Sequence, residues 1–180
     1  MASSPSLPVL VAVALLALLS PAALAAGGRE ERARIRVYVH EQFTGPNATV
    51  GSVAPSRLGA NSTFGEVGVV DDVLRAGPDP SSQEVGRYQG LFAGADLADA
   101  NYFSAITLVF TAGERNGSTL SLQGNYAFPV DDALERAVVG GTGAFRMARG
   151  VSMLKVVSAE TDGSVFQLDL VVFTPRRRGY

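Results

Sequence analysis

The sequence predicts an all-β fold, and three observations support this prediction. Apolar and polar residues alternate with a period of two in short segments, as in Ile35 to His40. Clusters of Gly, Pro, Asn, Asp and Ser separate about eight such segments, and no long segment has the 3.6-residue period of a helix. A sandwich and a barrel both fit this pattern. We favour a barrel, because a closed ring of about eight strands has no exposed edge and can hold one small ligand.

The first half of the barrel is expected to begin with the alternating strand at Ile35 to His40. A long loop over 43–62 follows, rich in Gly, Pro, Asn and Ser, and loops of this length are usually functional or mobile. Strands are expected next over 64–72 and 84–92, separated by the turn residues of 76–82. The last of these strands contains glycines, which suit a bend.

The second half is predicted from further segments and their turns. Asn-Gly at 116–117 and Asp-Gly at 162–163 indicate hairpin turns, and the polar residues 131–136 are expected to form a connection with one helical turn. The strands in this half are expected over 103–111, 118–123, 138–139, 145–157 and 165–173.

The most distinctive stretch is Val138-Val-Gly-Gly-Thr-Gly-Ala-Phe-Arg-Met-Ala-Arg-Gly150. Its glycines predict a tight turn or a bulge that leads into a strand at the rim of the barrel. A phosphate-binding loop does not fit, because no Lys-Ser or Lys-Thr pair follows the glycines. A dinucleotide-binding motif does not fit either, because no helical pattern begins after Gly143.

The start of the chain predicts a secretory signal peptide over 1–25. Val9 to Leu19 is apolar, Ser20-Pro21 ends this run, and Ala23-Leu24-Ala25 offers a cleavage site of small residues. The run is shorter than the about 20 apolar residues that cross a bilayer, so we expect no membrane span. The rest of the chain is expected to form a flexible arm over 26–34, a barrel domain over 35–174 and a basic tail over 175–180.

The composition excludes several kinds of site. The chain has no cysteine and one histidine, His40, which excludes thiolate chemistry and multi-histidine metal sites. A Ser-His-Asp triad would have to use His40, and no Gly-x-Ser-x-Gly motif is present. We therefore expect no metal and no cofactor. A formal net charge of -2 and a pI of about 5.4 argue against a nucleic-acid partner.

Three triplets, beginning at Asn47, Asn61 and Asn116, match the acceptor pattern for N-glycosylation. Together with the leader they predict a secreted glycoprotein whose acceptor segments face solvent. The run Arg176 to Arg178 is interpreted as a solvated terminus, with a contact to a cell wall or polyanion as the alternative.

The glycine-rich stretch resembles the signature of plant dirigent proteins, and three other blocks agree in the same order. They are Phe64-Gly-Glu-Val-Gly-Val-Val-Asp-Asp72, Val85-Gly-Arg-Tyr-Gln-Gly90, and Leu108-Val-Phe-Thr111 with Asn116-Gly-Ser-Thr-Leu120. The resemblance implies an eight-stranded antiparallel β-barrel, calycin-like and of the dirigent and allene-oxide-cyclase type. It also implies a homo-oligomer, with a trimer favoured over a dimer, in the plant apoplast or cell wall.

The function that the resemblance implies is control of regio- and stereoselectivity in phenoxy-radical coupling during lignan biosynthesis. Monolignols such as coniferyl alcohol supply the radicals, and a separate laccase or peroxidase makes them. We therefore expect the chain to be a non-oxidising auxiliary and not an enzyme, acting by positioning alone. Two alternatives stay open. One is an acid–base enzyme that acts on a phenolic quinone methide, which needs at least two convergent polar side chains. The other is a secreted ligand-binding or defence module without catalysis.

The candidate catalytic residues are Glu41 and Asp71. Glu41 stands where the resemblance implies an acid after a Tyr-x-His pattern, and Asp71 matches the family's aspartate. Adjacent strand residues point to opposite faces, so at most one of Asp71 and Asp72 enters a barrel. The structural alternatives are a solvated strand end for Glu41 and a turn cap before Gly77-Pro78 for the aspartate pair.

The candidate substrate-binding residues also follow from the resemblance. It implies a tyrosine where Phe92 stands, an aspartate near Tyr126 and an arginine where Leu134 is placed, with Arg136 nearby but displaced. Arg149 belongs to the signature, and pairing with a carboxylate is its structural alternative. The full set is Phe92, Tyr102, Phe110, Tyr126, Leu134 and Arg149.

Overall fold

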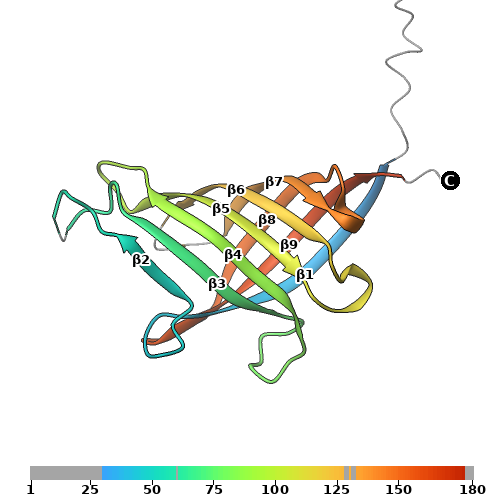
Figure 1. Cartoon of the computed structure of the whole chain (residues 1–180), viewed down its shortest axis with the longest axis horizontal. Coiled ribbons are helices and arrows are strands. Elements are labelled where there is room, and N and C mark those ends of the chain that lie inside the picture. Colours follow the sequence, from blue (N-terminus) through green and yellow to red (C-terminus); the bar gives the residue numbers. More distant parts are fainter. Residues whose placement is uncertain (1–29, 60, 128–129, 131–132, 177–180) are drawn as a thin grey trace, which may run out of the picture.

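The computed structural model describes residues 30–59, 61–127, 130 and 133–176. These residues form nine strands and two short 3-10 helices (Figure 1). The 3-10 helices are η1 (Gly113–Arg115) and η2 (Gly143–Phe145). The strands are β1 (Glu30–Gln42), β2 (Val50–Ala54), β3 (Val67–Arg75), β4 (Glu84–Gly94), β5 (Asn101–Phe110), β6 (Thr119–Ala127), β7 (Leu134–Thr142), β8 (Arg149–Ala159) and β9 (Gly163–Pro175).

Eight of the described strands close into an antiparallel barrel, as the sequence predicts. The sheet runs in the order β1-β9-β8-β7-β6-β5-β4-β3-β2, and an additional pairing of β1 with β3 completes the ring. In that pairing, Tyr38 to His40 lie opposite Val73 to Arg75. β2 pairs with the other half of β3 and lies outside the ring. The sequence predicts only loop over 43–62, because four of the five β2 residues are exposed and no apolar alternation marks the strand.

Period-two alternation sets which side chains enter the barrel. Ile35, Val37 and Val39 of β1 are buried inside, and the intervening residues face outward. Among these outward residues, Arg36 pairs with Asp169 of the neighbouring β9 at 2.6 Å. β9 buries every second residue from Ser164 to Val172. Both strands therefore contribute one continuous apolar face to the interior.

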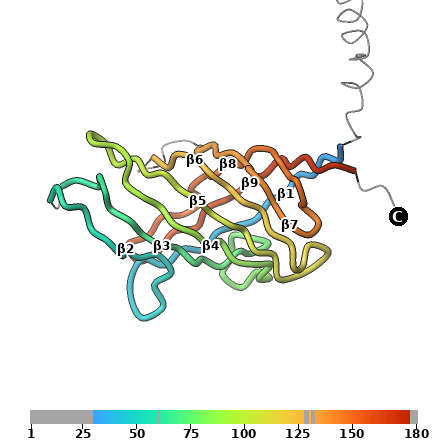
Figure 2. Tube along the Cα trace, turned by 45° about the horizontal axis from the view of Figure 1, so that its top comes forward, coloured from blue at the N-terminus to red at the C-terminus, as the bar shows by residue number. Residues whose placement is uncertain are grey.

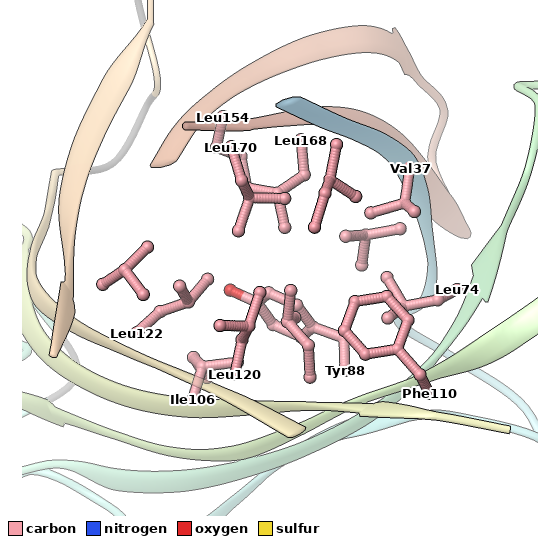
Figure 3. Close-up of a cluster of buried hydrophobic side chains, with 14 of the residues drawn as sticks. Val37, Leu74, Tyr88, Ile106, Phe110, Leu120, Leu122, Leu154, Leu168 and Leu170 are labelled. Carbon is pink, nitrogen blue, oxygen red and sulfur yellow. The ribbon is translucent and has the colours of Figure 1, made fainter. Parts of the chain in front are cut away.

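Large aliphatic side chains fill much of the interior (Figure 3). Leu154, Leu168 and Leu170 on one wall face Leu120 and Leu122 on the opposite wall in this view. The ring of Tyr88 lies among these side chains, so its hydroxyl is buried with them. Packed side chains therefore fill most of the interior of the barrel.

The glycine-rich stretch contains the predicted bulge at the rim. Ser121 of β6 lies opposite Gly140, whereas Leu122 lies opposite Val138, so Val139 is the extra residue. Gly141 allows the close approach that follows, since a Cβ there would lie 2.6 Å from the carbonyl oxygen of Thr119. η2 then leads into β8, as the interpretation of a turn feeding a strand requires.

Two expected boundaries are wrong. β1 begins at Glu30, so residues 30–34 are strand and not a flexible arm, because β9 continues to Pro175 and supplies their partners. Residues 134–136 begin β7 and form no helical turn, because Leu134 to Arg136 pair with β8. The expected signal peptide over 1–25, residues 26–29 of the arm and residues 177–180 of the tail lie outside the described residues.

In the described part of the chain, no helix has the length and apolar character needed to cross a membrane.

Candidate functional site

A cavity of about 270 Å³ opens at one end of the barrel. Its lining includes the last part of β1 and the first part of β9, whereas the opposite ends of these two strands lie together where the described chain begins and ends (Figure 2). Most lining atoms are apolar, from side chains that include Phe43, Val70, Phe92, Ile106 and Phe166. The polar lining residues are Glu41, Asp72, Tyr88, Tyr102, Ser104 and Tyr126.

Asp72 is the carboxylate of β3 that enters the cavity. It is 1% exposed, and the Thr49 hydroxyl donates a hydrogen bond to its Oδ1 at 2.5 Å. Burial raises the pKa of Asp72 to about 8, and the nearby Glu41 carboxylate adds to this rise. Asp72 is therefore a carboxylic acid that keeps its proton near neutral pH.

Glu41 lines the same cavity from β1. Burial raises the pKa of Glu41 to about 7. Because two neighbouring carboxyls resist ionising together, the Glu41 carboxylate adds to the rise in the pKa of Asp72 and favours one shared proton. This arrangement offers one proton donor and one proton acceptor next to an apolar chamber.

Asp71, the candidate from the sequence, lies on the outer face of β3. Its Oδ1 accepts hydrogen bonds from Arg87 at 2.8 Å and from Gln89 at 3.0 Å, and Arg87 lowers the pKa of this carboxyl. An exposed, ion-paired carboxylate has no access to the cavity. The structure thus moves the candidate acid from Asp71 to Asp72.

Arg136 enters the barrel beneath the cavity and is 2% exposed. Its Nη1 donates to the Tyr88 hydroxyl at 2.8 Å and to Ser104 Oγ at 3.3 Å. Its Nε and Nη2 have no hydrogen-bond partner among the described residues. The guanidinium lies 5.9 Å from the ring centroid of Tyr126, which is within cation–π range.

The expected roles of Leu134 and Arg136 are therefore corrected. Leu134, Arg136 and Val138 alternate along β7, and burial increases from Leu134 to the other two. Leu134 packs against the hydrophobic core without lining the cavity, whereas Arg136 supplies the buried guanidinium. The bulge at Val139 comes after these residues, so it does not displace Arg136 from the inner face.

Aromatic side chains form one wall of the cavity. The rings of Phe92 and Tyr102 meet edge to face, with centroids 5.3 Å apart. The Tyr102 hydroxyl donates to Glu66 at 3.2 Å, and Tyr126 lies deeper, where burial raises the pKa of its hydroxyl. Phe92, Tyr102 and Tyr126, which the sequence analysis names as candidates for substrate binding, thus line one cavity.

Two other candidates lie away from the cavity. Phe110 is buried in the core, with its ring centroid 5.5 Å from that of Phe145. Arg149 is exposed, pairs with Glu30 at 2.6 Å and lies over the Phe173 ring at 5.1 Å. Arg149 therefore pairs with a carboxylate, which is the structural alternative that the sequence analysis gives for it. Neither Phe110 nor Arg149 lines the cavity.

Ser104 and Glu66 are site residues that the sequence analysis does not identify. Ser104 shares the inner face of β5 with Ile106 and Leu108, so strand alternation could have placed it inside. Glu66 precedes β3 and is recognised only through its hydrogen bond with Tyr102. No sequence pattern indicates that contact.

The glycosylation acceptors Asn47, Asn61 and Asn116 are all exposed. This is the placement that modification would require. Across the described ranges, no group of three or more His, Cys, Asp or Glu side chains lies close enough to hold a metal ion.

Comparisons with known proteins agree on one family. The model of the family described as Dirigent-like protein matches residues 32–173. Dirigent protein 1 of Arabidopsis thaliana is 41% identical over 129 residues, which is 70% of this chain and 70% of the relative. Pterocarpan synthase 1 of Glycyrrhiza echinata is 37% identical over 160 residues, 86% of this chain and 84% of the relative. A solved pterocarpan synthase dirigent protein superposes with a TM-score of 0.76 at 33% identity, covering 84% of this chain and 90% of that one.

Proposed function

The chain belongs to the dirigent family, and we propose that it controls stereochemistry by acid–base catalysis on a phenolic quinone methide bound in its barrel. Glu41 and Asp72 are the proposed catalytic pair. The observation that carries this proposal is the placement of both carboxyls, with raised pKa values, in one apolar cavity. An acid–base enzyme needs at least two convergent polar side chains, and Glu41 and Asp72 meet this requirement.

The proposed step is an intramolecular ring closure. A hydroxyl oxygen of the substrate attacks the methide carbon, and the ionised carboxylate takes the hydroxyl proton. The protonated carboxyl gives its proton to the carbonyl oxygen, which becomes a phenol as the ring regains aromaticity. One proton is taken and one is given, so the pair exchanges its protonation states and needs no oxidant or reductant.

Arg136 would stabilise the negative charge that develops on the phenol oxygen. Arg136 is not among the lining residues, but its Nη1 donates to the hydroxyl of Tyr88, which does line the cavity, at 2.8 Å. The buried cation would therefore act on the phenol oxygen through its charge and through Tyr88. The neighbouring Tyr126 and Tyr88 rings would confine the aromatic part of the substrate. The walls then expose one face of the methide carbon, which is the source of stereoselectivity.

The volume of the cavity favours a small aromatic ligand. About 270 Å³ is just below the range of about 300–1,000 Å³ that is usual for ligand pockets. One phenylpropanoid unit fits this volume better than two. A second unit would have to lie toward the mouth, beside the exposed Phe43.

Coupling of monolignol radicals is the second function that the site supports. The aromatic wall at Phe92 and Tyr102 would hold one coniferyl alcohol radical, made by a separate laccase or peroxidase, while its partner approaches from the mouth. Joining two such radicals through their side chains gives a bis-quinone methide. The same carboxyl pair would then close its rings.

The cellular setting is part of the proposal. We infer a secreted glycoprotein of the plant apoplast or cell wall, supported by the apolar leader and by three exposed acceptor asparagines. We also infer a homo-oligomer, a trimer in preference to a dimer. Support comes from the exposed Val69 and Leu91, which lie opposite each other on the outer wall of β3 and β4. Sedimentation of the purified protein would test the assembly.

The first experiment is oxidation of coniferyl alcohol by laccase with and without the protein, followed by chiral chromatography of pinoresinol. We expect one enantiomer in excess with the wild type and with the outer-face control Asp71→Asn. Asp72→Asn should give less pinoresinol, because ring closure of the coupled intermediate then lacks the carboxyl pair. A racemate with the wild type would contradict coniferyl alcohol coupling.

A second arm separates the two functions. It supplies a hydroxybenzyl alcohol carrying a side-chain nucleophile, which forms a quinone methide by losing water, and measures the rate of ring closure. Acceleration by the wild type and its loss in Asp72→Asn would support acid–base catalysis. If the protein changes neither the rate nor the enantiomer ratio in either arm, the proposed function is wrong and the binding-module alternative remains.

A further inference from the structure

Thr49 completes the barrel wall beside Asp72. β1 and β3 pair directly only from Tyr38 to His40, and beyond this point the two strands separate. Thr49 stands between them: its N–H donates to the Gln42 carbonyl at 2.9 Å, and its carbonyl accepts from the Asp71 N–H at 2.8 Å. Thr49 therefore bridges Gln42 of β1 and Asp71 of β3, where the next backbone hydrogen bonds between these two strands would form.

The Thr49 side chain is held as firmly as its backbone. Its Oγ1 accepts a hydrogen bond from the Gln42 N–H at 2.9 Å and donates one to Asp72 Oδ1 at 2.5 Å. The Gln42 carbonyl oxygen is a second acceptor for the hydroxyl proton, at 3.4 Å. Because Asp72 is buried, this hydroxyl is its hydrogen-bond partner within the described structure.

We propose that Thr49 is a positioning residue that holds the Asp72 carboxyl toward the cavity and serves it in both protonation states. This inference rests on the acid–base function proposed above. When Asp72 is ionised, the Thr49 hydroxyl donates to it. When Asp72 is neutral, its own proton can point to Thr49 Oγ1 while the threonine proton turns to the Gln42 carbonyl.

The other groups that act on Asp72 do not replace this hydrogen bond. Glu41 of β1 raises the pKa of Asp72, and Arg87 of β4, on the outer face, lowers it less than Thr49 does. The remaining titratable neighbours with a described interaction are Asp71 on β3, Tyr88 on β4 and Tyr126 on β6. Arg136 on β7 acts on the two tyrosines. The Thr49 hydrogen bond lowers the pKa of Asp72, whereas burial and Glu41 raise it. Removing the hydroxyl should therefore raise the pKa of Asp72.

Thr49 is also the third residue of the acceptor triplet Asn47-Ala-Thr49. One residue thus serves a surface modification site and the cavity, since Asn47 is exposed while Thr49 reaches Asp72. A change at Thr49 alters both, so the test needs a variant that changes the triplet alone. Asn47→Gln removes the acceptor and keeps Thr49, whereas Thr49→Ser keeps both the hydroxyl and the triplet.

The test is a pH titration of the purified full-length secreted protein by infrared spectroscopy. The carbonyl stretch of a protonated carboxylic acid reports on ionisation, and the difference from Asp72→Asn assigns the band. We expect Thr49→Val to move the Asp72 midpoint upward by about one pH unit, because it loses a donor to the charged form. Thr49→Ser and Asn47→Gln should titrate like the wild type.

Two results would overturn the inference. One is an unchanged midpoint in Thr49→Val, and the other is an equal shift in Asn47→Gln, which would assign the effect to the glycan. Thr49→Ala is a second variant without the hydroxyl, for use where the valine variant does not fold. The titration needs no substrate, so its result stands even where the assays of stereoselectivity contradict the proposed function.

Discussion

Asp71 and Asp72 are adjacent in β3 and lie on opposite sides of the barrel wall. Asp71 is exposed and pairs with Arg87 at 2.8 Å, whereas Asp72 faces the cavity and is 1% exposed. The pKa of Asp71 is lowered by Arg87, and the pKa of Asp72 is raised to about 8 by burial. Strand alternation thus gives two identical side chains opposite ionisation behaviour, and only the inner one can act as an acid near neutral pH.

The first prediction concerns the stability of Asp72→Asn as a function of pH. Burial raises the pKa of Asp72 to about 8 in the folded wild type, whereas in the unfolded chain the pKa returns to the ordinary aspartate value of 3.8. Between these values the folded state binds more protons, so the contribution of Asp72 to stability falls as pH rises. The asparagine variant should lack this fall. Urea unfolding at a series of pH values measures the difference.

Asp71→Asn is the matched control for that series. In the folded wild type the pKa of Asp71 is lowered. The contribution of Asp71 to stability is therefore present above the pKa that it has in the unfolded chain, and it disappears as pH falls. An exposed ion pair of this kind contributes about 0–1 kcal/mol, so the change should be small and opposite in sign. If Asp72→Asn and the wild type lose stability in parallel up to pH 8, Asp72 is already ionised in the folded protein.

The second prediction concerns Glu41→Gln. Because the Glu41 carboxylate raises the pKa of Asp72, its removal should lower the Asp72 midpoint in an infrared titration. It should also abolish the stereoselectivity of ring closure, since the pair loses its proton acceptor. Glu84→Gln, on the exposed start of β4, is the control. Unchanged stereoselectivity in Glu41→Gln would mean that Glu41 is only a strand-end residue.

The fold was predictable where one face of a strand is continuously apolar. β1 and β9 have this pattern, and the bulge in β7 is indicated by paired glycines after two valines. β2 was not predictable, because its side chains are mostly exposed and its place depends on backbone pairing with β3. The start of β7 was missed because it buries an arginine, which reads as a polar connection in the sequence.

The site was predictable only in part. Glu41, Phe92, Tyr102 and Tyr126 line the cavity as expected. The choice between Asp71 and Asp72 depends on which face of β3 turns inward, and a pair of neighbouring aspartates does not reveal this. The role of Arg136 depends on burial of a charged group without a carboxylate partner in the described structure, which sequence patterns do not predict.

The third prediction concerns Gly68, which lies opposite Phe92 in the pairing of β3 and β4. A Cβ at this position would lie 2.0 Å from Phe92 Cζ, so the ring must move. Gly68→Ala should cost about 1–3 kcal/mol of unfolding free energy and reduce binding of a phenolic ligand. Gly51→Ala is the control, since a Cβ there meets nothing within 4 Å.

The double variant Gly68→Ala with Phe92→Leu tests the cause of this effect. A smaller and more flexible side chain at position 92 leaves room for the added methyl group, so the two changes should not be additive. Calorimetric or urea unfolding of the wild type, the two single variants and the double variant gives the coupling free energy between positions 68 and 92. Additive costs would show that Gly68 is needed for its own backbone and not as space for the ring.

The fourth prediction concerns Arg136 and Tyr88, whose hydrogen bond is 2.8 Å long. Arg136→Met should lower stability by about 1–3 kcal/mol, because the Tyr88 hydroxyl loses its buried partner. Adding Tyr88→Phe removes that hydroxyl as well, and replacing a buried cation and its partner by apolar groups is often neutral or stabilising. We therefore expect the double variant to unfold at or above the wild-type urea midpoint while it loses stereoselectivity. A double variant that unfolds below the wild-type midpoint would show that the guanidinium holds the barrel together, and retained stereoselectivity would remove Arg136 from the proposed site.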